Sequence, residues 1–261
     1  MERELFKNYF KKINSLFIML LMSIVLLILF VSSSYRILYK EKLTINFDKY
    51  KYSTNVNDID IIKSSCVKNI ITDTINDSKK YIFFKEEVNN ESNILKKIDS
   101  NINIIKKELN YNGDNSILRS ILFNEINDIS IKLNSFLNEN TEIYINFLIL
   151  FSTNSAFITL IVIFSILLLI LILTNKDFSW MKNVSNVFMI ITMSYLLASF
   201  ILTIIFSYST KLPVFDVRIE FLRAISNVIF NNQVKIWILL LTSGVIYRIL
   251  YIMFNKTIKN S

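Results

Sequence analysis

The chain has 261 residues, 52% of them hydrophobic, and a mean hydropathy of +0.44, which excludes an ordinary soluble domain. Its formal net charge is +8, but residues 35–144 contribute none of it, because they carry sixteen basic and sixteen acidic side chains. The excess lies beside the apolar runs instead. It therefore indicates contact with the anionic headgroups of a lipid bilayer and not with nucleic acid.

The residue types also restrict the chemistry that the chain can perform. The sequence has no histidine, which removes the commonest general base and the commonest zinc ligand. Its two glycines are isolated and form no phosphate-binding loop, and the single cysteine, Cys66, excludes an intramolecular disulfide. We therefore expect a protein that is not an enzyme and that holds no cofactor and no metal.

The first predicted element is a membrane-spanning helix over residues 15–34, preceded by a basic segment, residues 1–14. Crossing a hydrocarbon core about 30 Å thick takes roughly 20 mainly apolar residues, and the run Ser15–Val31 comes close to that length. It is longer than the apolar part of a typical signal peptide, and Tyr35 and Arg36 follow where a cleavage site would need small residues. We interpret it as a retained anchor.

Residues 35–144 are predicted to form a mainly helical extracytoplasmic domain. Apolar residues recur at steps of three and four in two successive stretches, at Ile94, Ile98, Ile102, Ile105 and Leu109, and then at Leu118, Leu122, Ile126, Ile129, Leu133 and Phe136. This spacing places each set on one face of a helix. Gly113 lies between the stretches and marks a turn, so the sequence predicts an antiparallel helical hairpin.

The start of this domain is less regular. Ile59, Ile62, Cys66 and Ile70 form another helical stripe, whereas Leu43–Tyr50 alternates apolar and polar residues and allows a short strand. The two carboxylates in Asn57–Asp60 have no third ligand at metal spacing, so a solvated turn is the better interpretation.

Two further spans are predicted over residues 145–174 and 184–208. Neither span contains Asp or Glu, which disfavours a carboxylate proton relay and intramembrane aspartyl proteolysis. The second span includes a polar patch, Ser152–Ser155, which hydrogen bonds between helices would satisfy.

Residues 213–232, which begin at the only proline of the chain, are predicted to form an amphipathic interfacial helix. One narrow polar stripe contains Asp216, Glu220, Arg223, Asn227 and Asn231, and most of the other residues there are apolar. A helix of this kind is expected to lie at the membrane surface with its polar stripe toward water. A gating or partner-binding helix is the alternative.

The fourth predicted span covers residues 234–254 and is followed by a tail, residues 255–261. Arg248 lies within it, six residues before the end, and its side chain is long enough to reach the headgroups. Together with Tyr251 and Lys256 it is expected to anchor the helix at the membrane edge. The alternative is a functional charge inside the membrane. Gly244 would allow a neighbouring helix to approach closely.

The orientation follows from basic residues in short loops, because long domains are translocated largely regardless of their charge. One side has nine such residues, and the other has four: Lys211, Arg218, Arg223 and Lys235. The nine are Arg3, Lys7, Lys11, Lys12, Lys176, Lys182, Arg248, Lys256 and Lys259. This count favours cytoplasmic termini, although Arg36, Lys40 and Lys42 pull the other way.

The sequence therefore predicts an all-α integral membrane protein with four transmembrane helices and an extracytoplasmic helical domain between helices 1 and 2. A bacterial cell membrane is the expected location. The favoured function is a non-catalytic scaffold, sensor or assembly subunit that works through other membrane or envelope proteins. The alternative is a permease-like subunit of an ABC-type transport or mechanotransmission complex with a cytoplasmic ATPase, which shares this layout. The short loop Asn175–Asn183 leaves such an ATPase little surface.

Overall fold

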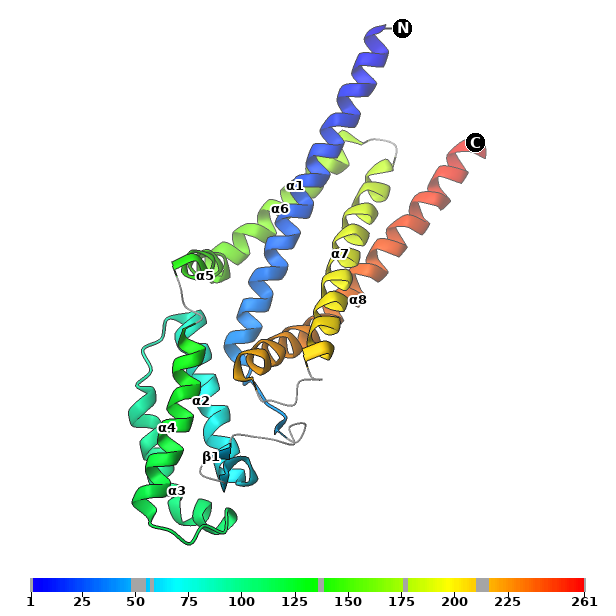
Figure 1. The fold of residues 1–261 in the computed structure, drawn as a ribbon. Coiled ribbons are helices and arrows are strands. Elements are labelled where there is room, and N and C mark those ends of the chain that lie inside the picture. Colours follow the sequence, from blue (N-terminus) through cyan, green and yellow to red (C-terminus); the bar gives the residue numbers. More distant parts are fainter. Residues whose placement is uncertain are drawn as a thin grey trace. The chain divides into compact units, whose positions relative to one another are not determined.

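The computed structural model describes residues 2–47, 55–56, 59–135, 139–175, 178–209 and 216–260, and most of them are helical (Figure 1). The helices are α1 (Glu2–Lys40), α2 (Ser65–Phe84), α3 (Asn90–Glu108), α4 (Asn115–Asn134), α5 (Glu139–Ser152), α6 (Asn154–Thr174), α7 (Ser179–Ser209) and α8 (Val217–Asn260). Two short antiparallel strands, β1 (Asn55–Val56) and β2 (Ile59–Asp60), precede a 3₁₀ turn, Ile61–Lys63. A sequence with two glycines and one proline offers few helix breakers, which accounts for this content.

Among the residues that the structure describes, three helical stretches are long and apolar enough to cross a membrane: Tyr9–Lys40, Asn154–Thr174 and Val217–Lys256. The chain divides into two compact units, which we describe separately. The first unit comprises residues 1–36, 148–201 and 230–261, and the second comprises residues 37–147 and 202–229.

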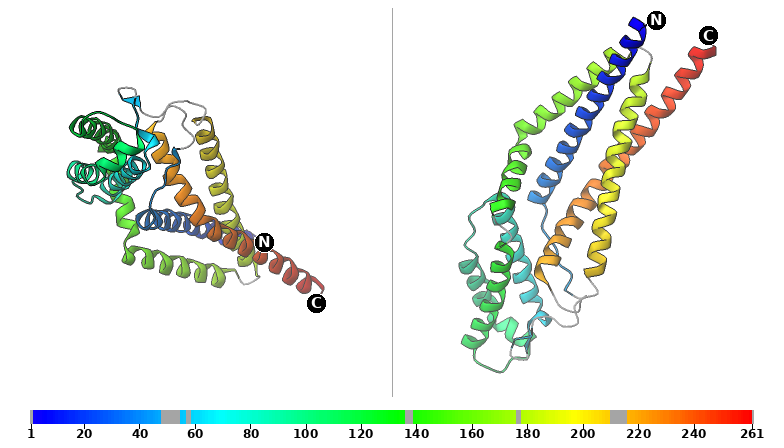
Figure 2. Two further views of the ribbon diagram at one scale, coloured as in Figure 1. Left: turned by 90° about the horizontal axis from the view of Figure 1, so that it is seen from below. Right: turned by 45° about the horizontal axis from the view of Figure 1, so that its top comes forward.

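The first unit is built from α1, α6, α7 and α8 around one apolar core (Figure 2). Buried residues of α1 recur every fourth position, so they form one stripe along the helix. The buried core consists of Ile18, Met22, Leu26, Phe30, Leu171, Val184, Val187, Ile191 and Trp237. The outer faces are also apolar: Leu20, Leu173 and Leu239 are each more than half exposed. An apolar surface on both sides of a helix is typical of a membrane protein.

Gly244 allows α7 and α8 to approach closely within this unit. A Cβ atom at that position would lie 3.3 Å from atoms of both Phe188 and Met189 and 3.5 Å from the backbone oxygen of Ser185. The close approach expected from this glycine is therefore present.

The predicted span over residues 145–174 is divided into two helices. The helix is interrupted at Thr153, whose backbone is extended. The Thr153 hydroxyl accepts a hydrogen bond from the Ala156 amide and so caps α6. The Ser32 hydroxyl of α1 donates to the Phe151 carbonyl at the break, with a distance of 2.7 Å, and Arg36 donates to Asn154. The polar patch thus caps a helix as well as joining two helices.

The predicted interfacial helix and fourth span, in contrast, form one continuous helix, α8. No glycine or proline separates residues 232 and 234, and Gln233 between them is fully buried. Its side-chain nitrogen donates to the Phe30 carbonyl of α1 at 3.1 Å. A buried amide with a partner in α1 thus lies at the predicted boundary, and the helix continues through it.

The second unit contains a three-helix bundle of α2, α3 and α4, in which each helix contacts the other two. The predicted hairpin stripes face its core: Ile94, Ile98, Ile105, Leu118, Leu122, Ile126, Ile129 and Leu133 are all buried. Ile102 and Leu109 are half-buried, and Phe136 lies outside the described residues. The helical hairpin is therefore present, and α2 completes the bundle with Val67, Ile71 and Ile75.

Helix α3 ends at a left-handed residue, Asn110, whereas the sequence predicted that the turn would lie at Gly113. Asn110 takes the left-handed conformation with a φ of 51°. Its amide donates to the Lys107 carbonyl and the Tyr111 amide donates to the Lys106 carbonyl, which is the Schellman ending of a helix. Asparagine tolerates this conformation better than most residues, so glycine is not needed there.

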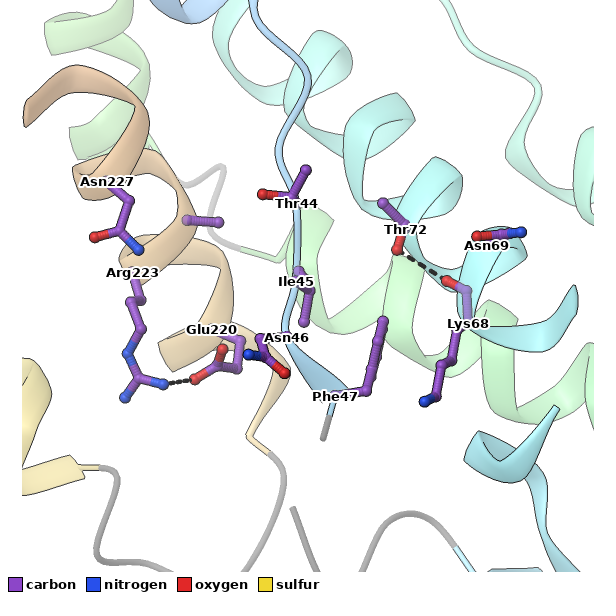
Figure 3. A pocket seen from close by; sticks show the side chains of 11 residues that line it. Thr44, Ile45, Asn46, Phe47, Lys68, Asn69, Thr72, Glu220, Arg223 and Asn227 are labelled. Carbon is purple, nitrogen blue, oxygen red and sulfur yellow. Dashed lines mark hydrogen bonds and ion pairs between the residues drawn. The ribbon is translucent and has the colours of Figure 1, made fainter. Parts of the chain in front are cut away.

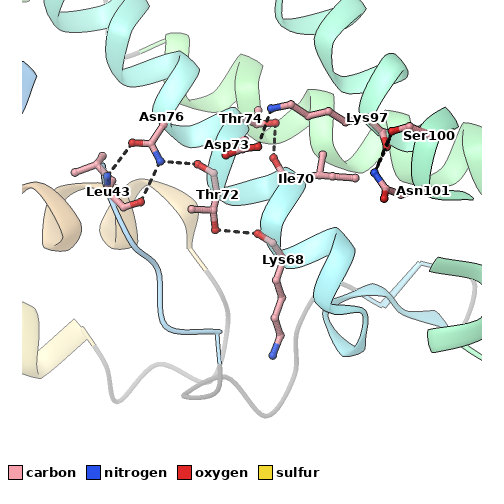
Figure 4. Close-up of polar contacts among 10 residues, drawn as sticks. All are labelled: Leu43, Lys68, Ile70, Thr72, Asp73, Thr74, Asn76, Lys97, Ser100 and Asn101. Carbon is pink, nitrogen blue, oxygen red and sulfur yellow. Dashed lines mark hydrogen bonds and ion pairs between the residues drawn. The ribbon is translucent and has the colours of Figure 1, made fainter. Parts of the chain in front are cut away.

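The segment after α1 is extended but does not form the expected strand over residues 43–47; residues 48–50 lie outside the described residues. Figure 4 shows that the Asn76 side chain of α2 bonds both backbone groups of Leu43, at 2.8 Å and 3.0 Å. The Asn76 amide thus satisfies the two backbone groups that a neighbouring strand would otherwise bond. The buried ammonium of Lys79 donates to the carbonyls of Leu38 and Glu41 and caps the end of α1.

Candidate functional site

A polar cavity of about 550 Å³ lies in the second unit (Figure 3). Three segments far apart in the sequence surround it: the extended chain after α1, the first half of α2, and the first turns of α8. Its lining residues are Thr44, Ile45, Asn46, Phe47, Lys68, Asn69, Thr72, Glu220, Arg223, Ala224 and Asn227. Hydroxyl, amide and charged groups dominate this wall, which therefore suits a polar group better than an apolar one.

Glu220 and Arg223 form an ion pair at this wall, and both side chains are nearly buried, with exposures of 5% and 11%. The sequence placed them on a stripe facing water, and the structure corrects this. Asp216, at the start of the same stripe, is exposed, and its carboxylate accepts a hydrogen bond from the Arg218 amide at 2.9 Å. The middle of the stripe is covered by protein, whereas its first residue caps the helix.

The first turns of α8 are held against the helical bundle by two contacts. The Phe221 ring, which is 2% exposed, stacks on Phe83 of α2 with 6.2 Å between ring centroids. The Arg218 guanidinium donates to the Ser135 hydroxyl at the end of α4, at 3.2 Å. This segment therefore packs on protein within the second unit, and its place at the membrane surface stays a prediction.

Cations and carboxylates are distributed over the bundle in a way that shifts several pKa values. Hydrogen bonds from the hydroxyls of Ser64 and Ser65 lower the pKa of Glu108. Glu108 ends α3 and also accepts from the Cys66 amide, so it caps the start of α2. Burial raises the pKa of Asp77 and lowers that of Lys79. These groups tie helices together and do not line the cavity.

The three predicted anchoring residues lie on the last part of α8. Arg248 is half-buried, and its guanidinium lies 3.5 Å from the Asn186 side-chain oxygen of α7. Tyr251 is half-buried and Lys256 is exposed. Arg248 thus faces a neighbouring helix and is not among the residues that line the cavity. Its role as an anchor stays a prediction.

The sequence placed Glu220, Arg223 and Asn227 on one polar stripe but did not identify the rest of the cavity. Lys68, Asn69 and Thr72 lie on the polar face of a helix in which only the apolar residues form a recognisable pattern. The segment Thr44–Phe47 carries no motif. The sequence of a helix shows which of its faces is polar. It does not show which distant segment of the chain packs over that face.

The geometry offers recognition groups: amides, hydroxyls and one buried pair of opposite charges. Among the residues that the structure describes, no three His, Cys, Asp or Glu side chains are grouped so that they could hold a metal ion. No family model, no curated protein and no solved structure matches this chain.

Proposed function

We propose that the chain is a non-catalytic, multi-pass membrane protein that acts as a scaffold, sensor or assembly subunit through an extracytoplasmic helical domain. The observation that carries this proposal is the polar cavity, because its wall joins α2 to the first turns of α8. From there α8 continues through a stretch that is long and apolar enough to cross a membrane. A partner's polar group bound in the cavity would touch the helical domain and a membrane helix at once.

The proposal includes four membrane crossings, through α1, α6, α7 and α8. Support for α7 comes from its packing in the same apolar core as the other three helices. Its outer residues Ile190, Met193 and Leu197 are also more than half exposed, at 60%, 57% and 62%. An exposed apolar face of this extent is expected to face lipid.

Both termini are proposed to be cytoplasmic, on the basis of the basic residues in the short loops. Two of these residues, Lys176 and Lys211, lie outside the described residues. With this orientation the α2–α4 bundle is outside the cell, where a partner protein of the envelope would reach the cavity.

Site-specific crosslinking in intact membranes tests the proposal. A photoreactive residue replaces Asn69, which is exposed and lines the cavity, and a matched control replaces Ile117, which is 54% exposed on α4 and does not line it. Products captured in mild detergent are then identified. We expect a defined envelope partner from position 69 and much less of it from position 117.

Equal capture at both positions would contradict the cavity as the docking site. A stoichiometric cytoplasmic ATPase that co-purifies with the chain would support the permease-like alternative instead.

A further inference from the structure

A second polar cavity, of about 360 Å³, lies in the first unit, among α1, the end of α6 and the start of α7. Lys11 and Lys12 of α1 and Lys182 of α7 all line it. Among its described lining residues none is acidic. Three ammonium groups around one hollow produce a positive potential that attracts an anion.

Neutral groups of the cavity add further hydrogen-bonding capacity. The Asn183 side chain of α7 donates to the buried Ser15 hydroxyl of α1 at 2.7 Å, which fixes the two helices beside the cavity. Ser179, the first residue of α7, is also in the lining, so the positive end of that helix dipole lies beside the lysines. Arg248 bonds to the lining residue Asn186 and brings a fourth cation to the same region.

Aromatic residues indicate the depth of this region in a bilayer. The Trp180 and Tyr247 rings pack edge to face with centroids 6.0 Å apart, and Phe178 stacks on Phe254 at 4.9 Å. Trp180 is two residues from Lys182. Tryptophan and tyrosine gather at the level of the lipid headgroups.

We propose that this cavity binds a phosphate group, and that its source is the headgroup of an anionic phospholipid. The inference rests on the proposed membrane location but not on the partner-binding cavity of the second unit. Lys12 and Lys182 would contact the phosphate oxygens, and Asn183 and Asn186 would bond the polar part of the headgroup. The acyl chains would extend along the exposed apolar faces of α1, where Leu16 lines the same cavity and Leu20 is 58% exposed.

Native mass spectrometry of the full chain in detergent measures this binding by titration with phosphatidylglycerol and, separately, with zwitterionic phosphatidylcholine. The variant Lys12→Gln/Lys182→Gln removes two charges from the cavity. The control variant Lys256→Gln removes one charge from an exposed residue of α8 that is not in its lining. Helical circular dichroism checks that each variant folds.

We expect preferential binding of phosphatidylglycerol and a loss of roughly five-fold in affinity per lysine, or about 25-fold for the double variant. The Lys256→Gln control should bind within about two-fold of the original chain, and millimolar inorganic phosphate should not displace the lipid. Equal binding of both lipids, or equal losses in the two variants, would overturn the proposal. Displacement by inorganic phosphate would overturn the lipid as the source and assign the cavity to free phosphate.

Discussion

Glu220 and Arg223 are a buried ion pair for which removing one partner should cost more stability than replacing both. Both side chains are shielded from solvent, so desolvation offsets much of their mutual attraction. The pair also lines the polar cavity. Substitutions can therefore separate the contribution of the pair to stability from its contribution to binding in the cavity.

The variant Glu220→Gln deprives a buried guanidinium of its carboxylate and should destabilise the start of α8 by roughly 3 kcal/mol. The matched double variant, Glu220→Leu/Arg223→Met, should cost much less, because no buried charge is left. Hydrogen exchange of peptides from residues 217–229 in the full chain measures both. A double variant as unstable as Glu220→Gln would contradict this account.

Glu108 is predicted to make the bundle sensitive to acid. Hydrogen bonds from Ser64 and Ser65 hold its pKa in the folded state below the ordinary value of 4.5. A carboxyl with a lowered folded-state pKa stabilises the fold above its unfolded pKa, and this contribution is lost as the pH falls through and below about 4.5. Hydrogen exchange of α2 and α3 should therefore accelerate below that pH, and Glu108→Gln should weaken the dependence.

Asp77 is predicted to change stability with pH in the opposite direction to Glu108, and it therefore provides a control. Burial raises its pKa in the folded state, so its contribution to stability increases as the pH falls toward its ordinary value of 3.8. The variant Asp77→Asn should make the acid loss of stability steeper. If both variants changed the pH dependence in the same direction, the assignment of these two carboxyls would be wrong.

At the scale of elements, the adjacent residues Ile104 and Ile105 separate the two faces of α3. Ile105 is fully buried in the three-helix bundle, whereas Ile104 is 51% exposed. The two positions share the same residue type and nearly the same place in the helix. They therefore form a matched pair for measuring what the bundle core contributes.

Ile105→Ala should destabilise the bundle by about 3 kcal/mol, because it removes apolar contacts and leaves a cavity. Ile104→Ala should change the free energy of unfolding by less than about 0.5 kcal/mol. Hydrogen exchange of α2, α3 and α4 in the full chain provides the measurement. Similar losses in the two variants would rule out the bundle core described above.

Local patterns in the sequence were sufficient to predict α3 and α4 and their buried faces. The helical stripe predicted from Ile59 to Ile70 was wrong at its start, because Ile59 lies in β2 and Ile62 in the 3₁₀ turn. The stripe from Leu118 to Leu133 is buried as expected, because helical periodicity depends only on the spacing of apolar residues. The boundaries were harder to predict. The break at Thr153 and the continuity of α8 through Gln233 depend on partners in α1. A local pattern carries no information about such distant contacts, which is also why the stripe containing Glu220 was assigned to water.

At the scale of the whole chain, the three long apolar helices found among the described residues support a membrane location. Long polar segments such as residues 35–144 are translocated largely regardless of charge, so the basic residues in the short flanks of the spans determine the orientation. Arg36, Lys40 and Lys42 oppose the proposed orientation. Arg36, however, donates to Asn154 and lies over the Phe157 ring at 4.8 Å, so contacts with α6 satisfy this charge locally.

Cysteine accessibility in intact cells tests this orientation. In a chain with Cys66→Ala, a cysteine replaces Asn112, which is exposed in the turn between α3 and α4, or Lys256, which is exposed near the end of α8. Because residues 35–144 are proposed to be outside, Asn112→Cys should react with a membrane-impermeant thiol reagent before lysis. Lys256→Cys should react only after lysis, because the proposed cytoplasmic side is closed to the reagent. The reverse pattern would invert the topology, and would place the partner-binding cavity in the cytoplasm, where an ATPase could reach it.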